Sequence, residues 1–233
     1  GTPRRVGIVA VAPSSPFTGG AILGDRVRMR DLAGDTGVFI RSMASRGSLG
    51  GLALASSGIV LAMDAAGYDI ILVETVGAGQ AEVDIARLAH TTLVVEAPGL
   101  GDDIEAIKAG ILEIADVLVI NKADRPGVES TERALRSMLQ LAHPSNHVFQ
   151  DTILKAGHPP AAIKGENGSD LQAGNLNRSI WVPPIQRTVA IEGIGIAELV
   201  HEIERHRQYL VESGELEKRE WARLKSVVDL LVR

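Results

Sequence analysis

The chain has no cysteine, no long apolar run and no excess of positive charge, and each absence excludes a class of protein. Without cysteine there are no disulfides, thiolate metal sites or cysteine nucleophiles, which is compatible with a reducing cytosol. No window resembles a signal peptide or an apolar span of about 18 residues. We therefore expect a soluble, cytoplasmic protein with no membrane partner. A formal net charge of −5 offers no basic field for phosphate backbones, so we also expect no nucleic-acid partner.

What the chain does have is enough apolar sequence for a core: 45% of its 233 residues are hydrophobic. Short runs rich in Val and Ile recur along it, at residues 5–11, 68–76, 91–97, 117–121 and 186–191. These runs are apolar on both sides instead of alternating, as in parallel strands covered by helices on both faces. The sequence therefore predicts an α/β fold with a mostly parallel sheet.

Helices are expected between and after these strands. In residues 102–116 isoleucines recur at spacings of three and four behind two aspartates, which suits a helix N-terminus. Residues 50–66 and 131–142 have a similar pattern. The stretch 155–179 is rich in Gly, Pro and Asn and predicts a long surface loop.

Two charged helices are predicted at the C-terminus, over 195–212 and 215–232. We expect an α/β domain over 1–194 and a helical extension over 195–233. The extension is either a solvated hairpin or, through its apolar stripe, a dimerisation element.

The most informative polar residues follow the run 117–120, as Asn121, Lys122 and Asp124 in the pattern N-K-x-D. Ligands of open α/β sheets bind at the carboxyl ends of the strands. A carboxylate at Asp124 can accept two parallel hydrogen bonds from the ring N–H and exocyclic amine of guanine, and adenine lacks that donor pair. Asn121 would brace the loop and contact the base, and the Lys122 stem would cover the ring. The alternative is an ordinary turn with solvated polar residues.

Two further segments fit a phosphate and metal site. Glu74 ends the strand 68–74 and could hold Mg²⁺, and Gly77 would let a backbone N–H approach a terminal phosphate. Asp25, in the loop 12–29, could be a second hard oxygen ligand for Mg²⁺. Taken alone, that loop is better explained by surface turn chemistry.

The chain also carries long family motifs, in order. They are PSSPFTGGAILGDRVRM (13–29), SMASRGSLGGLA (42–53), ILVETVGAGQAEVD (71–84), APGLGDDIEAIKAGILEIADVLVINKAD (97–124), WVPPI (181–185) and ELVHEIERHRQYL (198–210). In these motifs the chain resembles the methylmalonyl-CoA mutase-associated GTPases, the MeaB/ArgK group of P-loop G proteins. Proteins of that group are chaperones of adenosylcobalamin-dependent mutases.

The resemblance implies GTP or GDP and Mg²⁺ as ligands, an adenosylcobalamin-dependent acyl-CoA mutase as partner, and a homodimer. By position, it implies that Asp25 and Glu74 are the acids on the Mg²⁺ side and that Gly77 is the phosphate-sensing switch glycine. It makes Asn121, Lys122 and Asp124 the guanine readers, and Val189 with Ala190 the last base-contact loop. Lys108, within a further switch at 99–108, would join a charge network, or else be a bare helix-surface lysine.

The chain departs from the family in two ways. No G-x-x-x-x-G-K-[ST] phosphate cradle occurs in it, and Ala12 stands where the family's D-P-S-S motif has Asp. We expect the chain to begin about one βα unit late, and this polypeptide to hydrolyse GTP negligibly. Two alternatives are a non-catalytic interaction remnant and a metal-insertion GTPase of hydrogenase or urease maturation. The histidines show no recognisable metal-ligand spacing, which a metal-insertion GTPase would need.

Overall fold

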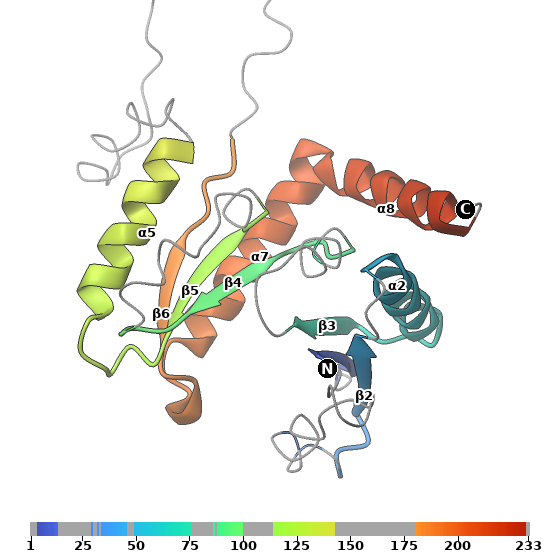
Figure 1. Cartoon of the computed structure of the whole chain (residues 1–233), viewed down its shortest axis with the longest axis horizontal. Coiled ribbons are helices and arrows are strands. Elements are labelled where there is room, and N and C mark those ends of the chain that lie inside the picture. The colour runs from blue at the N-terminus through green and yellow to red at the C-terminus, as the bar shows by residue number, and fades with distance from the viewer. Residues whose placement is uncertain are drawn as a thin grey trace, which may run out of the picture. The chain divides into compact units, whose positions relative to one another are not determined.

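The computed structural model describes residues 4–13, 29, 32, 34–45, 49–75, 86, 88–99, 114–142 and 180–231. Two compact units make up the chain (Figure 1). The first joins residues 1–92 to residues 214–233, and the second spans residues 93–213. The domain boundary at residue 194 stays a prediction. Among the described helices, none combines the length and the apolar character that crossing a bilayer requires.

The first unit contains a parallel sheet of three strands in the order β2-β1-β3. Its strands are β1 (Val6–Pro13), β2 (Val38–Ser45) and β3 (Ile70–Thr75). Helix α2 (Leu49–Ala65) packs on this sheet, where Met63 joins the buried Val9 and Val11. Helix α8 (Glu215–Leu231) contacts α2.

Strand β2 is an element that the sequence pattern did not predict. Arg41, Ser42 and Ser45 interrupt its apolar run, so it lacks the continuous Val and Ile content of the other strands. Strand β2 lies at one edge of the sheet and the apolar β3 at the other, so its composition is not a matter of edge position alone.

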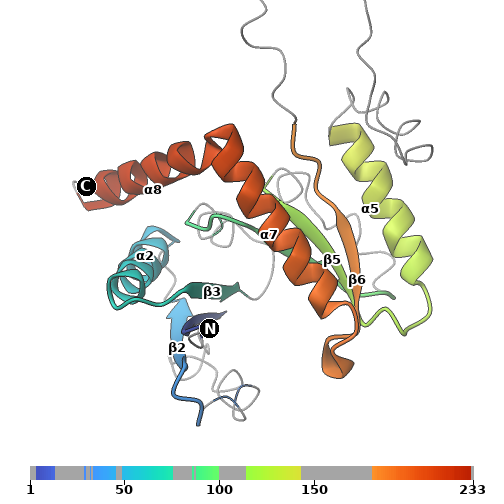
Figure 2. The same ribbon diagram turned by 180° about the vertical axis from the view of Figure 1, so that it is seen from behind.

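The second unit contains a parallel sheet in the order β4-β5-β6. Its strands are β4 (Leu93–Glu96), β5 (Val117–Asn121) and β6 (Ile185–Thr188). Helix α5 (Val128–Ala142) covers one face, and α7 (Ile196–Ser213) covers the other, as Figures 1 and 2 show from opposite sides. Both faces of β5 are consequently buried from Val117 to Ile120.

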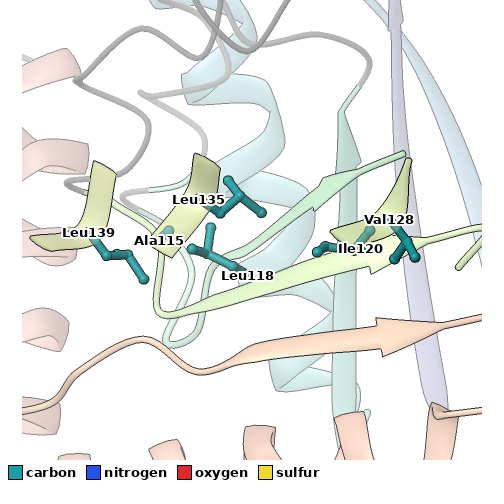
Figure 3. Packing of buried hydrophobic residues seen from close by; sticks show 6 residues of the cluster. All are labelled: Ala115, Leu118, Ile120, Val128, Leu135 and Leu139. Carbon is teal, nitrogen blue, oxygen red and sulfur yellow. The ribbon is translucent and has the colours of Figure 1, made fainter. Parts of the chain in front are cut away.

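The core of this unit lies between α5 and β5 (Figure 3). Leu118 and Ile120 point to one side of the strand, where they meet Leu135, Leu139 and Val128 of α5. Leu118, Ile120 and Leu135 are fully buried. This packing holds β5 rigidly, so the residues that follow its carboxyl end start from a fixed point.

The α/β fold with parallel strands is confirmed, and the expected strands shift by a few residues at their ends. The helix predicted over 102–116 and the loop predicted over 155–179 fall on residues that are mostly or wholly outside the described ones. The helices predicted over 50–66, 131–142, 195–212 and 215–232 are present as α2, α5, α7 and α8.

Candidate functional site: the carboxyl ends of strands β5 and β6

The N-K-x-D tetrad forms a tight turn at the carboxyl end of β5. Lys122 has a φ of 58°, in the left-handed region that a non-glycine residue seldom adopts. The Arg125 N–H donates to the Lys122 carbonyl at 3.0 Å, which closes the turn. Backbone held in this sparsely populated region costs free energy and persists where the surrounding structure fixes it, commonly at functional sites.

Asn121 is held by residues of β6 and of the turn after it. Its Oδ1 accepts a hydrogen bond from Thr188 Oγ1 at 3.2 Å and another from the Ala190 N–H at 3.1 Å. Asn121 and Thr188 are partners in the parallel register of β5 and β6, so their side chains stand next to each other. The amide of Asn121 is therefore fixed from two directions.

The loop after β6 is folded closely against the strand ends. Val189 donates its N–H to the Ile194 carbonyl at 3.0 Å, and Ala123 donates to the Thr188 carbonyl at 3.0 Å. A Cβ at Gly195 would lie 2.2 Å from the Arg187 carbonyl oxygen, and its φ is 75°, so only glycine fits there. These contacts join the tetrad and the loop into one structure.

The charged residues of the tetrad are open to solvent. Lys122 and Asp124 are both exposed, and within the described part of the chain Asp124 forms no ion pair. A carboxylate in this position has its lone pairs available to a pair of N–H donors on a ligand. The arrangement can therefore bind a planar group that presents two parallel donors.

The second unit thus brings together five of the predicted site residues: Asn121, Lys122, Asp124, Val189 and Ala190. Val189 and Ala190 do not present free groups to a base, as a simple base-contact loop would. The Val189 side chain is buried, with 7% exposed, and the Ala190 N–H is already bonded to Asn121. In this structure the loop therefore supports the tetrad through its backbone.

Sequence reasoning missed Thr188, which lies within a strand that the pattern predicted. The signal that could have found it is a hydroxyl residue at the end of the strand next to the tetrad. That signal has meaning only once the register of β5 and β6 is known.

Glu74, the predicted metal ligand of the first unit, is the penultimate residue of β3 and is half-buried. It lies in register with Ala10, at the carboxyl end of a parallel sheet. A carboxylate there has the hard oxygen donors that Mg²⁺ prefers. Asp25, Gly77 and Lys108 lie outside the described residues, and no group of three potential His, Asp or Glu ligands occurs within the described ones.

Burial changes the ionisation of one acid at the carboxyl end of the second sheet. Glu96, the last residue of β4, is half-buried, and desolvation raises its pKa above the usual value. In helix α5 the pKa of Glu132 shifts in the opposite direction. Burial alone would raise the pKa of Glu132, but hydrogen bonds from Arg136 and Arg187 outweigh it and lower the pKa.

Comparison with known proteins places this geometry in a family. The family described as "Methylmalonyl Co-A mutase-associated GTPase MeaB" matches residues 2–233. A protein of Pyrococcus abyssi is 44% identical over 227 residues, which are 97% of this chain and 61% of that protein. GTPase ArgK of Escherichia coli is 36% identical over 92% of this chain and 56% of its own length.

A mammalian protein is also similar. The mitochondrial methylmalonic aciduria type A homolog of Mus musculus is 32% identical, over 91% of this chain and 44% of its own length. The chain spans 61% of the Pyrococcus abyssi relative and smaller shares of the other two.

The solved structures support the fold. HypB from Helicobacter pylori, in complex with nickel, matches with a TM-score of 0.50 over 88% of this chain and 76% of that one. At 14% sequence identity this likeness concerns the fold alone. On the family match across residues 2–233, the chain belongs to the methylmalonyl-CoA mutase-associated GTPase family MeaB.

Proposed function

We propose that this chain carries the guanine-reading part of a G protein that acts as a chaperone of an adenosylcobalamin-dependent acyl-CoA mutase. In this proposal the protein binds GTP and GDP with Mg²⁺ and couples nucleotide hydrolysis to the loading or protection of the mutase cofactor. It works in the cytoplasm as a homodimer. Family membership supports this assignment, because the family is described as associated with methylmalonyl-CoA mutase.

The observation that carries the proposal is the pairing of an exposed Asp124 with a fixed Asn121 at the carboxyl end of a buried strand. Asp124 would accept the ring N–H and the exocyclic amine of guanine. Adenine has an acceptor in place of that ring donor, so its complex would leave the carboxylate facing a lone pair. The Lys122 stem would lie along the base.

Magnesium would be held on the phosphate side by Glu74, with Asp25 as a second oxygen ligand. The ion would neutralise the charge of the terminal phosphates and orient them. The proposed roles of Gly77 as the phosphate-sensing residue and of Lys108 in a switch network follow from the family resemblance. Each of these four residues is a target for substitution in the full chain.

Calorimetric titration of the chain with GDP and with ADP tests the base assignment. We expect GDP to bind more tightly, and Asp124→Ala to remove most of that preference, a loss of roughly tenfold or more. The fold should be retained because Asp124 is exposed. Equal affinity of the unaltered chain for GDP and ADP would contradict guanine selection. Unfolding of Asp124→Ala at ordinary temperature would show that the residue is structural.

The partner is tested separately from the nucleotide. Purified chain and a purified methylmalonyl-CoA mutase are mixed with GDP and analysed by size-exclusion chromatography with light scattering. A complex containing two copies of this chain supports the chaperone and homodimer proposals. A monomer that never coelutes with the mutase contradicts both.

A further inference from the structure

The hydroxyl of Ser42 is a buried polar group of the first unit that the fold itself does not use. Its Oγ is enclosed by protein and has no hydrogen-bond partner among the described residues. A hydroxyl that leaves water without finding a partner loses hydrogen bonds that nothing replaces, so such groups are rare in folded chains. The presence of one is explained when a bound ligand supplies the missing partner.

Ser42 and Glu74 lie on the same rung of the sheet β2-β1-β3. Ala10 of the central strand pairs in register with Ser42 of β2 on one side and with Glu74 of β3 on the other. Register partners on neighbouring strands direct their side chains to the same face of the sheet. The rung is close to the carboxyl ends of the strands, since Glu74 is the penultimate residue of β3 and β2 ends three residues after Ser42.

This face of the sheet is the one opposite helix α2. Val9 and Val73 pack with Met63 of α2. Side chains alternate along a strand, so Ala10 and Glu74 face the other way. Between the hydroxyl of β2 and the carboxylate of β3 the central strand thus contributes only the methyl group of an alanine. The two polar side chains flank a small residue near the edge of the sheet where ligands of α/β folds bind.

The separation across this rung suits a hydrated ion. Two strand spacings place the Cα atoms of Ser42 and Glu74 about 9 to 10 Å apart. Side chains of this length do not bond to each other directly over that distance. Mg²⁺ keeps several of its waters when it binds to a carboxylate. A water on an ion held by Glu74 can therefore donate a hydrogen bond to the serine hydroxyl.

We propose that Ser42 is a positioning residue of the Mg²⁺ site, whose hydroxyl accepts a hydrogen bond from a water on the ion that Glu74 holds. The proposal rests on the proposed function, since it takes Glu74 as a ligand of Mg²⁺. Glu74 supplies the charge that attracts the ion. Ser42, on the other side of Ala10, orients the hydrated ion, and binding of the ion gives the buried hydroxyl its missing partner.

The test measures Mn²⁺ binding to the full chain saturated with GDP, by electron paramagnetic resonance of the free ion, with GDP alone as the blank. Mn²⁺ replaces Mg²⁺ as the probe because both prefer oxygen ligands. We expect Ser42→Ala to weaken Mn²⁺ binding by roughly three- to tenfold, the range for one hydrogen bond. Glu74→Gln should weaken it more, because a charged ligand is lost. Ser42→Thr keeps the hydroxyl and should bind Mn²⁺ like the unaltered chain.

Stability without metal separates positioning from a structural role. Because the Ser42 hydroxyl has no partner among the described residues, Ser42→Ala should leave the urea midpoint of the metal-free chain unchanged or raise it. Ser56→Ala is the matched control. Ser56 lies on α2, its side chain is fully buried, and its Oγ donates to Met43 Sδ at 3.8 Å. Removing that hydroxyl should leave Mn²⁺ binding as it was.

The outcomes distinguish this proposal from the proposed function. If Ser42→Ala binds Mn²⁺ as tightly as the unaltered chain and Glu74→Gln does not, the role of Ser42 is wrong and Glu74 remains a ligand. Unfolding of Ser42→Ala, or a lower urea midpoint without metal, also overturns the proposal, because the hydroxyl would then be structural. If the unaltered chain adds no Mn²⁺ binding to that of GDP alone, or Glu74→Gln binds Mn²⁺ equally well, the proposed Mg²⁺ site fails and this proposal fails with it.

Discussion

In this chain the orientation, backbone conformation and exposure of single residues depend on their surroundings more than on the residue type. Asn121 is an ordinary amide until β6 and the turn after it each supply a donor to its oxygen, and Lys122 takes a left-handed conformation that most sequences reserve for glycine. Asp124, three residues beyond the end of β5, remains exposed. The contrast between a fixed amide and an open carboxylate over so few residues is what makes the turn suitable for recognising a ligand.

Glu96 gives a prediction at this scale. Burial raises its pKa, so the folded chain favours the neutral carboxyl group. At pH values below the pKa that Glu96 has in the unfolded chain, its carboxyl group is protonated in the folded and the unfolded chain alike. No charge is then buried, so folding carries no cost from ionisation of this group. As the pH rises through the folded pKa, ionisation of Glu96 lowers the stability of the unaltered chain. We therefore expect Glu96→Gln to increase the free energy of unfolding at neutral pH.

Urea unfolding as a function of pH measures this effect. The difference between Glu96→Gln and the unaltered chain should shrink as the pH falls and vanish below the ordinary carboxyl range. Glu192→Gln, at an exposed glutamate of the same unit, is the control and should have little effect at any pH. A stabilisation that persists unchanged at acid pH would show that charge is not its cause.

Within the described residues of the second unit, polar contacts hold α7 and α5 at different places. At the start of β5, the fully buried His206 of α7 lies with its Nε2 3.2 Å from Asp116 Oδ1, and Trp181 Nε1 donates to the Asp116 carbonyl at 2.8 Å. Across β6 and α5, Arg187 bonds to Glu132, with Nη2 2.6 Å from Oε2. The first contact helps to hold α7 and the second α5, the helices on the two faces of the sheet.

The Arg187–Glu132 contact predicts a pH-dependent stability. Because hydrogen bonds from arginine lower the pKa of Glu132, its contribution is present above the unfolded pKa and is lost as the pH falls through the folded value. Glu132→Gln should reduce the free energy of unfolding by about 1 kcal/mol at neutral pH. This cost should disappear in acid, where the unaltered carboxyl is also neutral.

Glu129→Gln is the matched control for that prediction. Glu129 lies on the same helix, its side chain is 68% exposed, and its Oε1 is 3.6 Å from Arg187 Nη1. Such an exposed pair should be worth less than about 0.5 kcal/mol. If urea unfolding showed that Glu129→Gln and Glu132→Gln lower the free energy of unfolding equally, the half-exposed Arg187 would not interact more strongly with the more buried Glu132.

Elements also show what could be predicted from the sequence. Strand β5 is apolar from Val117 to Ile120, where both of its faces are covered, and that uniform pattern identifies it. Strand β2 has polar residues at Arg41 and Ser42, so its pattern does not identify a strand. The tetrad was predictable because its chemistry lies in consecutive residues. Thr188 was not, because its role depends on a register with Asn121, 67 positions away.

At the scale of the whole molecule, reading a base and cleaving a phosphate require different parts. The residues proposed to read the base, Asn121 and Asp124, lie at and just after the end of β5 in the second unit, and the acid proposed for Mg²⁺, Glu74, belongs to the first. In P-loop proteins the β and γ phosphates are held by the backbone N–H groups and the lysine of G-x-x-x-x-G-K-[ST]. That motif does not occur in these 233 residues.

We therefore predict that this polypeptide binds guanine nucleotide without hydrolysing GTP at the rate of a P-loop GTPase. Positioning and charge stabilisation of the transferred phosphate account for most of the catalysis in such enzymes, so the rate should be lower by roughly a thousandfold or more. Phosphate release from GTP and Mg²⁺ is measured beside GTPase ArgK of Escherichia coli as a full-length reference. Because a trace contaminant could also release phosphate, Asp124→Ala is assayed in parallel. Turnover comparable to the reference that is lost in Asp124→Ala would mean that other residues of this chain hold the phosphates, and the separation of base reading from catalysis would be wrong.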